Sequence, residues 1–204
     1  MRVFETYSKK YDAWYDKHKA AFFSELAAIK KALPKNKNGL EIGVGTGRFA
    51  AALGIRTGID PSPAMLKRAF KRGVGTRWGR GENIPFEDAS FDYVTVIITL
   101  CFVRNPLKVL KESARVLKSP GRIIVCIIDK ESLLGKFYRA KKSVFYKNAR
   151  FFTVREVTSL LKQAGFRDVS YYQTITDFPE KIRTVEKPKK GFGCGSFVVV
   201  SAKK

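Results

Sequence analysis

The sequence predicts an α/β protein with a doubly wound, mostly parallel sheet, an antiparallel edge strand and helices on both faces. Strand-like and helix-like segments alternate along the chain, which is typical of βαβ units around a parallel sheet. Segments 91–98 and 122–128 are almost continuously apolar, as strands covered on both faces are. The 204 residues are 45% hydrophobic and suffice for one core, so we expect 1–204 to form a single domain with seven strands.

The first half of the chain is divided by prolines and glycines. Pro34 ends a charged, aromatic-rich helical segment. Pro63 fits the start of a later helix, because its missing N–H has no partner in a first turn anyway. The expected elements, in order, are helix 7–33, strand 39–42, glycine-rich turn 43–47, helix 48–53, a strand that ends at 60, and helix 64–70.

The second half continues the alternation. Thr153 and Glu156 form a capping box that starts a helix ending near 164–165. The other expected elements are strand 91–98, helix 106–117, a turn at 120–121, strand 122–128, and two closing strands at 169–172 and 197–201. The closing strands, separated by a lysine-bearing loop with Lys187, Lys189 and Lys190, can pair antiparallel at the sheet edge.

The charge is strongly positive. Forty Lys and Arg against 18 Asp and Glu give +22, a field that attracts nucleic acid, phosphorylated metabolites or an acidic partner. A solvated lysine-rich surface explains the same numbers, since the basic residues are spread along the chain. RNA therefore stays open as a partner, and the sequence does not reveal the oligomeric state.

Several classes of protein are disfavoured. No apolar run approaches 18 residues, so no membrane span is expected. Cys101, Cys126 and Cys194 lie far apart without C-x-x-C spacing, which argues against a disulfide framework or a zinc site. No His, Asp and Glu cluster has the spacing of metal ligands, so no metal is expected. We expect a cytoplasmic location.

The most informative motif is a G-x-G-x-G turn between strand and helix, formed by Gly43, Gly45 and Gly47, with Asp60 closing the next strand. Such glycines let a ligand lie against the backbone, and the acidic strand end can take both ribose hydroxyls. A glycine turn without a ligand is the alternative, but strand, turn, helix and acidic strand end follow in order, which favours a ligand.

The spacing also separates the candidate ligands. The NAD fingerprint needs a third glycine at position 48, where this chain has Arg48, and no G-K-[ST] follows for a P-loop. An NAD(P)-dependent oxidoreductase is therefore disfavoured. The spacing suits a ligand without a pyrophosphate, such as S-adenosyl-L-methionine (SAM).

With these motifs the chain resembles the small class I SAM-dependent methyltransferases of the type 11 group, related to ubiquinone- and menaquinone-biosynthesis methyltransferases. The resemblance covers nearly the whole chain. It rests on five motifs in the family's order, at 41–49, 58–62, 81–86, 90–92 and 115–121. It implies a Rossmann-like fold, SAM as cofactor and methyl transfer to an acceptor, most readily a small molecule.

The resemblance also implies a role for each matching residue. Gly43, Gly45 and Gly47 would line the methionine and ribose. Glu41 would orient the methionine ammonium, and Asp60 would hold the ribose hydroxyls. Beside the adenine and the sulfonium, the implied contacts are Pro61 and Ser62 next to the adenine, Glu82 and Asn83 along its edge, and Thr99 and Leu100 facing the sulfonium.

Two departures from the family's pattern stand out. Arg80 lies where many relatives have an acidic residue that accepts from the adenine amino group. Many relatives also carry a histidine soon after the fourth strand, where this chain reads Leu100-Cys101-Phe102-Val103. No catalytic base is carried over, so the catalytic residues stay unassigned; Tyr11, Asp12 and Tyr138 are candidates if the acceptor must lose a proton.

Two segments are expected to cover the site. Tyr7, Tyr11, Trp14 and Tyr15 fall on one helical face, so residues 1–33 either pack onto the domain or form a helical lid in which Tyr11 contacts the cofactor. Residues 130–152 mix basic and aromatic side chains, as a substrate cap or as a solvated amphipathic cap. His18, the only histidine, is expected to be solvated.

Three functions remain open at this point. The first is a methyltransferase for a small molecule, with an anionic acceptor as one option. The second is an RNA or protein methyltransferase that uses the basic surface. The third is a nucleic-acid-binding module that keeps the fold without catalysis; steeply salt-dependent RNA binding without SAM binding would identify it.

Overall fold

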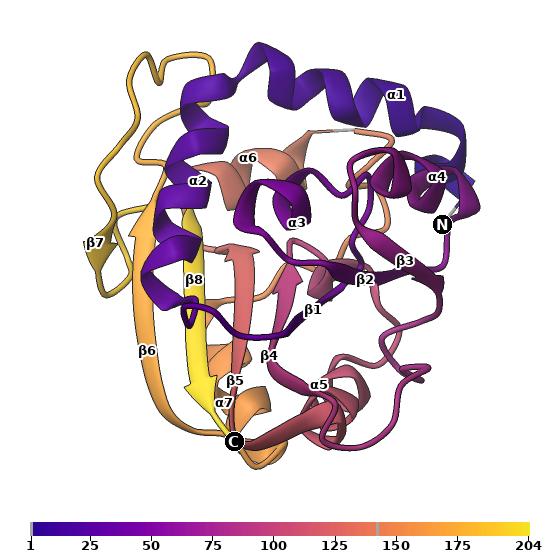
Figure 1. The fold of residues 1–204 in the computed structure, drawn as a ribbon. Helices are drawn as coiled ribbons and strands as arrows, with labels where there is room; N and C mark the ends of the chain where they lie inside the picture. The colour runs from indigo at the N-terminus through magenta and orange to yellow at the C-terminus, as the bar shows by residue number, and fades with distance from the viewer. Residues whose placement is uncertain (1, 142) are drawn as a thin grey trace.

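A computed structural model describes residues 2–141 and 143–204. In this part of the chain the centre is one eight-stranded sheet with the order β3-β2-β1-β4-β5-β8-β6-β7 (Figure 1). The strands are β1 (Gly39–Ile42), β2 (Thr57–Asp60), β3 (Gly75–Trp78), β4 (Phe91–Ile97), β5 (Leu117–Ile128), β6 (Arg167–Thr174), β7 (Lys189–Lys190) and β8 (Phe197–Lys203). Strands β1 to β5 are parallel, and β8 runs antiparallel between β5 and β6, which confirms the predicted sheet.

Strand β3 was not among the elements expected from the sequence, and the sheet differs from the prediction in two further places. The eighth strand is β7, because Lys189 and Lys190, predicted in a loop, pair with the outer edge of β6. The other difference is at β5, which begins at Leu117 and includes the expected turn at 120–121. Leu117 pairs with Phe91 of β4, and a register shift after Phe91 accommodates the additional residues.

Helices cover both faces of the sheet, as predicted. They are α1 (Arg2–Lys17), α2 (Lys19–Ala32), α3 (Arg48–Leu53), α4 (Pro63–Lys71), α5 (Pro106–Val116), α6 (Leu133–Ala140), α7 (Val154–Gln163) and a 3-10 turn η1 (Leu100–Phe102). One core joins the sheet to α2 and α3, and the other joins it to α5 and α7. The capping box of Thr153 and Glu156 starts α7, as expected. Within the described residues, each helix is too short or too polar to cross a bilayer.

The N-terminal segment folds as two helices, since the predicted helix 7–33 breaks at His18. The His18 ring stacks on Trp14 with centroids 4.5 Å apart, and its Nδ1 lies 2.8 Å from the Trp14 carbonyl oxygen. The expectation that His18 is solvated was wrong. The residue is 6% exposed, because it lies at the break between α1 and α2 and packs against Trp14. Residue 1 of the predicted lid and residue 142 of the predicted cap lie outside the described residues.

The aromatic side chains on one face of α1 are not all buried. Tyr11, Trp14 and Tyr15 pack onto the core shared by α2 and α3. Tyr7 lies at a kink in α1 and is 41% exposed. Helix α2 packs on β6 and β8, whereas α1 extends across to α4 (Figure 1).

Gly47, which precedes α3, has a packing role. A Cβ at Gly47 would lie 2.7 Å from the Ala69 Cα of α4, and the residue has a φ of +76°. A backbone atom cannot move aside as a flexible side chain does. Gly47 therefore allows α3 and α4 to approach each other at the start of the site.

We expect Gly47→Ala to lower the free energy of unfolding by about 2–4 kcal/mol, from left-handed strain plus overpacking. Gly54→Ala is the matched control, since Gly54 has a φ of +72° and nothing within 4 Å of a Cβ. Its cost should be strain alone, about 1 kcal/mol. Urea unfolding of both variants measures the difference. Equal losses of unfolding free energy would show that the close approach of α3 and α4 does not exclude a side chain at position 47.

Candidate functional site

The glycine-rich loop lies at the carboxyl end of β1, between β2 and β4, where ligands bind in open α/β sheets. The backbone N–H groups of Gly43 and Val44 donate to the Ile59 carbonyl at 2.8 and 2.9 Å. The N–H of Gly45 donates to Asp60 Oδ2 at 3.0 Å. The structure thus brings the predicted loop and the predicted acidic strand end into direct contact.

The glycines of this loop serve different purposes. A Cβ at Gly43 would lie 2.3 Å from the Thr99 side chain, so Gly43 makes room for the segment that follows β4. A Cβ at Gly45, with φ +53°, would meet only the Gly43 carbonyl oxygen at 4.0 Å. Gly45 therefore presents an open backbone surface that a ligand can approach.

Glu41 and Asp60 supply the negative charge of the site. Glu41 in β1 is 2% exposed, and its Oε2 has no hydrogen-bond partner among the described residues. Burial, and then the nearby charge of Asp60, raise the pKa of Glu41 well above its ordinary value. Burial also raises the pKa of Asp60 to about 6, although N–H groups of Ser62 and Gly45 partly oppose this shift. An unpartnered buried carboxyl of this kind suits a cationic group on a ligand.

Next to Asp60, the predicted adenine contacts Pro61 and Ser62 make hydrogen bonds to other residues of the protein. Ser62 caps α4, its Oγ accepting from Met65 N at 3.3 Å, and it also hydrogen-bonds to Glu5 of α1. The Pro61 carbonyl accepts from Trp78 Nε1 at 3.2 Å. Trp78 is 59% exposed and pairs with Asp60 across β2 and β3, so an aromatic face lies beside the acidic strand end.

Glu82 and Asn83 lie further along the same edge. Glu82 Oε1 accepts from the N–H groups of Arg104 and Asn105 at 2.8 and 3.3 Å, which holds the segment after β4. Asn83 is exposed and closes a turn, its N–H donating to the Arg80 carbonyl at 3.0 Å. The Glu82 side chain therefore has a positioning role that the motif did not indicate.

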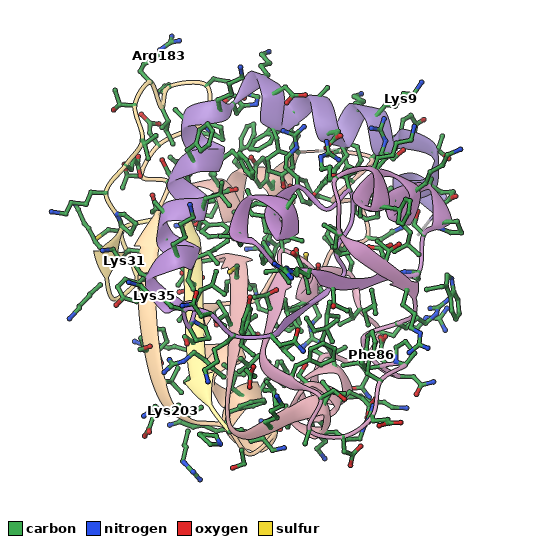
Figure 2. All side chains as sticks on the ribbon, viewed as in Figure 1. Lys9, Lys31, Lys35, Phe86, Arg183 and Lys203 are labelled. Carbon is green, nitrogen blue, oxygen red and sulfur yellow. The ribbon has the colours of Figure 1, made fainter. Side chains whose placement is uncertain are left out.

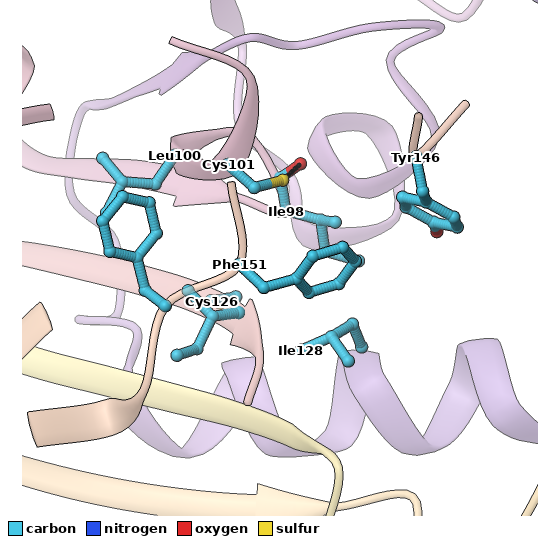
Figure 3. Close-up of a pocket in the computed structure, with 9 residues that line it drawn as sticks. Ile98, Leu100, Cys101, Cys126, Ile128, Tyr146 and Phe151 are labelled. Carbon is cyan, nitrogen blue, oxygen red and sulfur yellow. Dashed lines mark hydrogen bonds between the residues drawn. The ribbon is translucent and has the colours of Figure 1, made fainter. Parts of the chain in front are cut away.

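At the end of β4, Thr99 supports the loop and Leu100 enters the core. Thr99 Oγ1 donates to the Ile97 carbonyl at 2.9 Å, and Leu100 is fully buried. Beside them, Cys101 and Tyr146 line a small apolar cavity with room for about one water molecule (Figure 3). Burial raises the pKa of Cys101 to about 12, so this thiol is not a ready nucleophile.

Helix α1 is fastened over the loop by Asp12, which was a candidate base. Asp12 Oδ1 accepts from Thr46 Oγ1 at 2.9 Å and from Arg48 Nε at 3.1 Å. Asp12 Oδ2 lies 2.6 Å from Arg72 Nη2 and 3.3 Å from Arg68 Nη1. Burial alone would raise the pKa of Asp12, but hydrogen bonds from Arg72, Thr46 and Arg48 outweigh it and lower the pKa. Asp12 is thus a structural anchor and poorly suited to accept a proton.

Arg48 has a role that explains why position 48 is not a glycine. Its guanidinium pairs with Asp12 and, at 2.9 Å, with Asp16, and it lies 5.6 Å from the ring centroid of Tyr15. The first residue of α3 is therefore bound to α1. Arg48, whose presence disfavoured a dinucleotide ligand, thus helps to hold the N-terminal helix against α3.

Four tyrosines pack together on this face of the sheet, and the sequence analysis missed one buried acid in the same region. Tyr11 and Tyr15 come from α1, Tyr138 from α6 and Tyr146 from the following loop, and all four pack on the same core. We call these four residues the tyrosine cluster. Burial, with a smaller contribution from the buried Glu25 of α2, raises the pKa of each of the four tyrosines, so their hydroxyls stay protonated near neutral pH. The predicted lid and the predicted cap thus both contribute residues to this cluster.

Glu25 could have been found from the sequence. It interrupts an apolar helical stripe in which Ala21, Phe22 and Ile29 are all buried. A carboxyl in the middle of such a stripe has either a partner or a function.

Many basic side chains, in contrast, lie on the outer surface. Lys9, Lys31, Lys35, Arg183 and Lys203 project from separate parts of the surface (Figure 2). Each of these residues is exposed. The positive charge is thus distributed around the molecule at these positions, and the interior of the site is acidic and aromatic.

Comparisons with known proteins agree with this geometry. Residues 40–125 match the type 11 family described as methyltransferase domain. An uncharacterized protein of Methanocaldococcus jannaschii is 45% identical over 206 residues, covering 100% of both chains. A demethylmenaquinone methyltransferase of Staphylococcus aureus is 36% identical over 153 residues, covering 67% of this chain and 62% of the relative.

A solved structure is similar over the full length. It is a SAM-dependent methyltransferase of Thermotoga maritima, described as a possible histamine N-methyltransferase. Its TM-score to this chain is 0.97 at 45% identity, covering 100% of this chain and 99% of that one.

We expect Asp12→Ala to destabilise the protein by about 3 kcal/mol, because partly buried arginines lose their shared partner. Amide hydrogen exchange should accelerate in α1 and much less in α2. Asp16→Ala is the control: its carboxylate is 64% exposed and pairs with the same Arg48, so its loss should cost less than about 1 kcal/mol. Equal effects of the two substitutions would contradict the anchoring role of Asp12.

We expect the free protein to lose stability as the pH rises from about 4.5 to about 8. Burial raises the pKa of Glu25 from 4.5 to about 8. The native state therefore binds more protons than the unfolded state in this interval, and its stability falls with rising pH. The titratable groups around Glu25 are Tyr11, Tyr15, Tyr138, Tyr146 and Cys126.

The matching variant is Glu25→Gln, which should reduce this slope. Thermal melts at pH 5 and pH 8 should show a difference in Tm between variant and wild type that grows in the variant's favour at pH 8. A difference that does not change with pH would show that Glu25 does not titrate in this interval.

Proposed function

Because this chain belongs to the class I SAM-dependent methyltransferases of the type 11 group, we propose that it binds SAM along the loop after β1 and methylates a small molecule beside the tyrosine cluster. The observation that carries this proposal is Glu41, a buried carboxyl with an unpartnered oxygen two residues before the open loop. Its neighbour Asp60 and the open backbone of Gly45 complete a cradle that fits an amino acid joined to a ribose.

The residues divide the binding among them. Glu41 would accept hydrogen bonds from the methionine ammonium, and Gly45 would let the ligand lie against the backbone. Asp60 would accept from the ribose hydroxyls, because each carboxylate oxygen has a second lone pair beyond the N–H it already accepts. Trp78, near Pro61, offers an apolar face on the adenine side. SAM, when bound, supplies a methyl group activated by its sulfonium.

The protein's contribution to the reaction is then positioning and exclusion of water. Helices α1 and α6 and the loop with Tyr146 would cover the acceptor, and proximity of this kind contributes up to roughly 7–11 kcal/mol in favourable systems. The protonated tyrosines donate hydrogen bonds and do not act as bases near neutral pH. No catalytic base is assigned.

A small acceptor is favoured over RNA. Glu25 and Glu41 are buried carboxyls that offer a phosphate group no positive partner, whereas lysines such as Lys9, Lys31 and Lys35 are exposed on the outer surface. Steeply salt-dependent RNA binding would point to the basic surface instead. The three cysteines are unpaired, which accords with the expected cytoplasmic location.

We expect Glu41→Gln to weaken binding of SAM and of its demethylated product SAH about 10- to 100-fold, since a hydrogen bond to a charged group contributes about 1.5–3 kcal/mol. Calorimetric titration with SAH measures this change. Glutamine has nearly the same shape, so the fold should persist.

Glu156→Gln is the control for this substitution. Glutamine at position 156 preserves the capping box of α7, away from the site. Its SAH affinity should equal that of the wild type. Unchanged affinity in Glu41→Gln would remove Glu41 from the binding site, and a wild type that binds NADH but neither SAM nor SAH would overturn the proposed function.

A further inference from the structure

The two edges of the sheet are protected to different degrees. In the described part of the chain, the sheet ends in β7 on one side and in β3 on the other (Figure 1). Strand β7 consists of Lys189 and Lys190, and a very short edge strand of lysines is a common protection against pairing with another chain. Strand β3 has four residues, none of them lysine, and three of the four are exposed. Its outer edge therefore lacks the protection that β7 has.

The hydrogen-bonding groups of β3 that face outward follow from those that face inward. The N–H groups of Gly75 and Gly79 donate to carbonyl groups at the two ends of β2, at 2.8 and 3.4 Å. Because the hydrogen-bonding groups of successive residues in a strand alternate in direction, those of Thr76 and Trp78 point away from β2. Among the described residues no strand pairs with this side of β3. Thr76 and Trp78 thus present N–H and carbonyl groups to a strand from outside.

A groove lies beside this edge, on the face of the sheet to which Arg77 points. Its volume is about 550 Å³, and it is lined by Arg77, Ile84, Pro85, Phe86, Glu87 and Ser90. The Arg77 guanidinium donates to the Pro85 carbonyl, and its Cζ lies 5.1 Å from the centroid of the Phe86 ring. Arg77 is therefore held against the groove wall. The groove presents a cation and an aromatic ring next to an open strand edge.

The corner formed by α4 and β3 also carries exposed aromatic side chains. Trp78 of β3 is 59% exposed, and Phe70 of α4, the helix that packs on β3, is 71% exposed. These are the two largest exposed fractions among the large apolar side chains of the described residues. Exposed aromatic and arginine side chains are typical of surfaces that bind other proteins.

The surroundings of β3 are basic. Residues 61–81 contain six lysines and arginines and no acidic residue. Two of the arginines pair with Asp12, whereas Lys67, Lys71 and Arg80 are exposed and form no ion pair with any residue that the structure describes. A second copy of this chain, itself charged +22, is repelled by such a surface, and an acidic partner is attracted to it.

We propose that the outer edge of β3 is the docking site of a second, acidic protein, which adds an extended segment to the sheet as a further strand. The outward backbone groups of Thr76 and Trp78 would pair with that segment, and one of its side chains would enter the groove beside Arg77 and Phe86. An aromatic or acidic side chain suits these two groove residues. The inference goes beyond the proposed function, because docking at this edge requires neither SAM nor an acceptor.

Peptides selected from a random twelve-residue library displayed on phage serve as the probe, with the full chain as the immobilised target. The selected sequences should be rich in Asp and Glu, and their synthetic forms should bind in calorimetry. Replacing their acids by the corresponding amides should weaken binding about 10-fold, because the surroundings of β3 attract negative charge. Selected peptides without acidic residues would contradict the proposed chemistry of the partner.

Backbone methylation of the selected peptide shows whether it binds as a strand. Every second N–H of an added strand faces β3, and the others face solvent. Methylating an inward N–H should weaken binding about 10-fold or more, because a hydrogen bond is lost and a methyl group enters the strand interface. Methylating an outward N–H should leave the affinity unchanged. This alternation distinguishes strand pairing from binding by side chains alone, and it leaves the protein unaltered.

Hydrogen exchange and variants then place the peptide on the protein. The amides of Thr76 and Trp78 should gain protection when the peptide binds, and those of Lys189 and Lys190 at the other edge should not. Thr76→Pro should abolish peptide binding, because proline removes the outward N–H; an edge strand tolerates proline at such a position. Thr76→Val is the matched control, since it keeps the N–H and should bind the peptide as the wild type does.

Every outcome of these experiments bears on the proposal. Failure to select any binding peptide, equal effects of inward and outward methylation, or protection that appears away from β3 would each overturn it. Should Thr76→Pro not fold, as judged by its thermal melt, the methylation series and the exchange data still decide. Sedimentation of the wild type provides a further check, because a dimer that Thr76→Pro abolishes would identify the occupant as a second copy of this chain and refute the acidic partner.

Discussion

The hydrogen bonds between the loop after β1 and the end of β2 fix the geometry on which the rest of the site depends. The Ile59 carbonyl takes two N–H groups of the loop, and the Asp60 carboxyl takes a third. These bonds hold Gly45 with its backbone open and place Asp60 beside it. Asp12 of α1 is then fixed against the same loop through Thr46, so the N-terminal helix is positioned by the site that it covers.

The interior and the surface of this protein are organised by opposite charges. Glu25 and Glu41 are buried without full hydrogen bonding, and both lower the stability of the free protein above their ordinary pKa values. Arg48, Arg68 and Arg72, which lie near the loop, are paired with Asp12. Retaining Glu41 is understandable if it gains a cationic partner when the cofactor binds, because binding then restores the missing interaction.

The sequence predicted much of the cofactor loop but few of the contacts that hold the N-terminal helices against it. The glycine loop and Asp60 were found because their roles depend on local order: a turn follows a strand, and an acid ends the next one. His18 was placed wrongly because its burial depends on a break between two helices that the helical periodicity did not reveal. Arg48 was interpreted only as an absent glycine, since its partners Asp12 and Asp16 lie more than thirty positions away. Glu25 interrupts an apolar stripe of α2, but that signal was not used, and only the structure shows that the residue is buried.

By itself, then, the sequence determined most of the strands and helices, the family and the loop where the cofactor is expected, because these follow from periodicity and from short contiguous motifs. Only the tertiary structure decided that Asp12 anchors α1, that Glu82 holds the segment after β4, and that tyrosines from α1, α6 and the loop beyond it pack on one core. The physical reason is that burial and pairing of charge depend on distance in space, and residues from 12 to 146 meet only when the sheet has assembled.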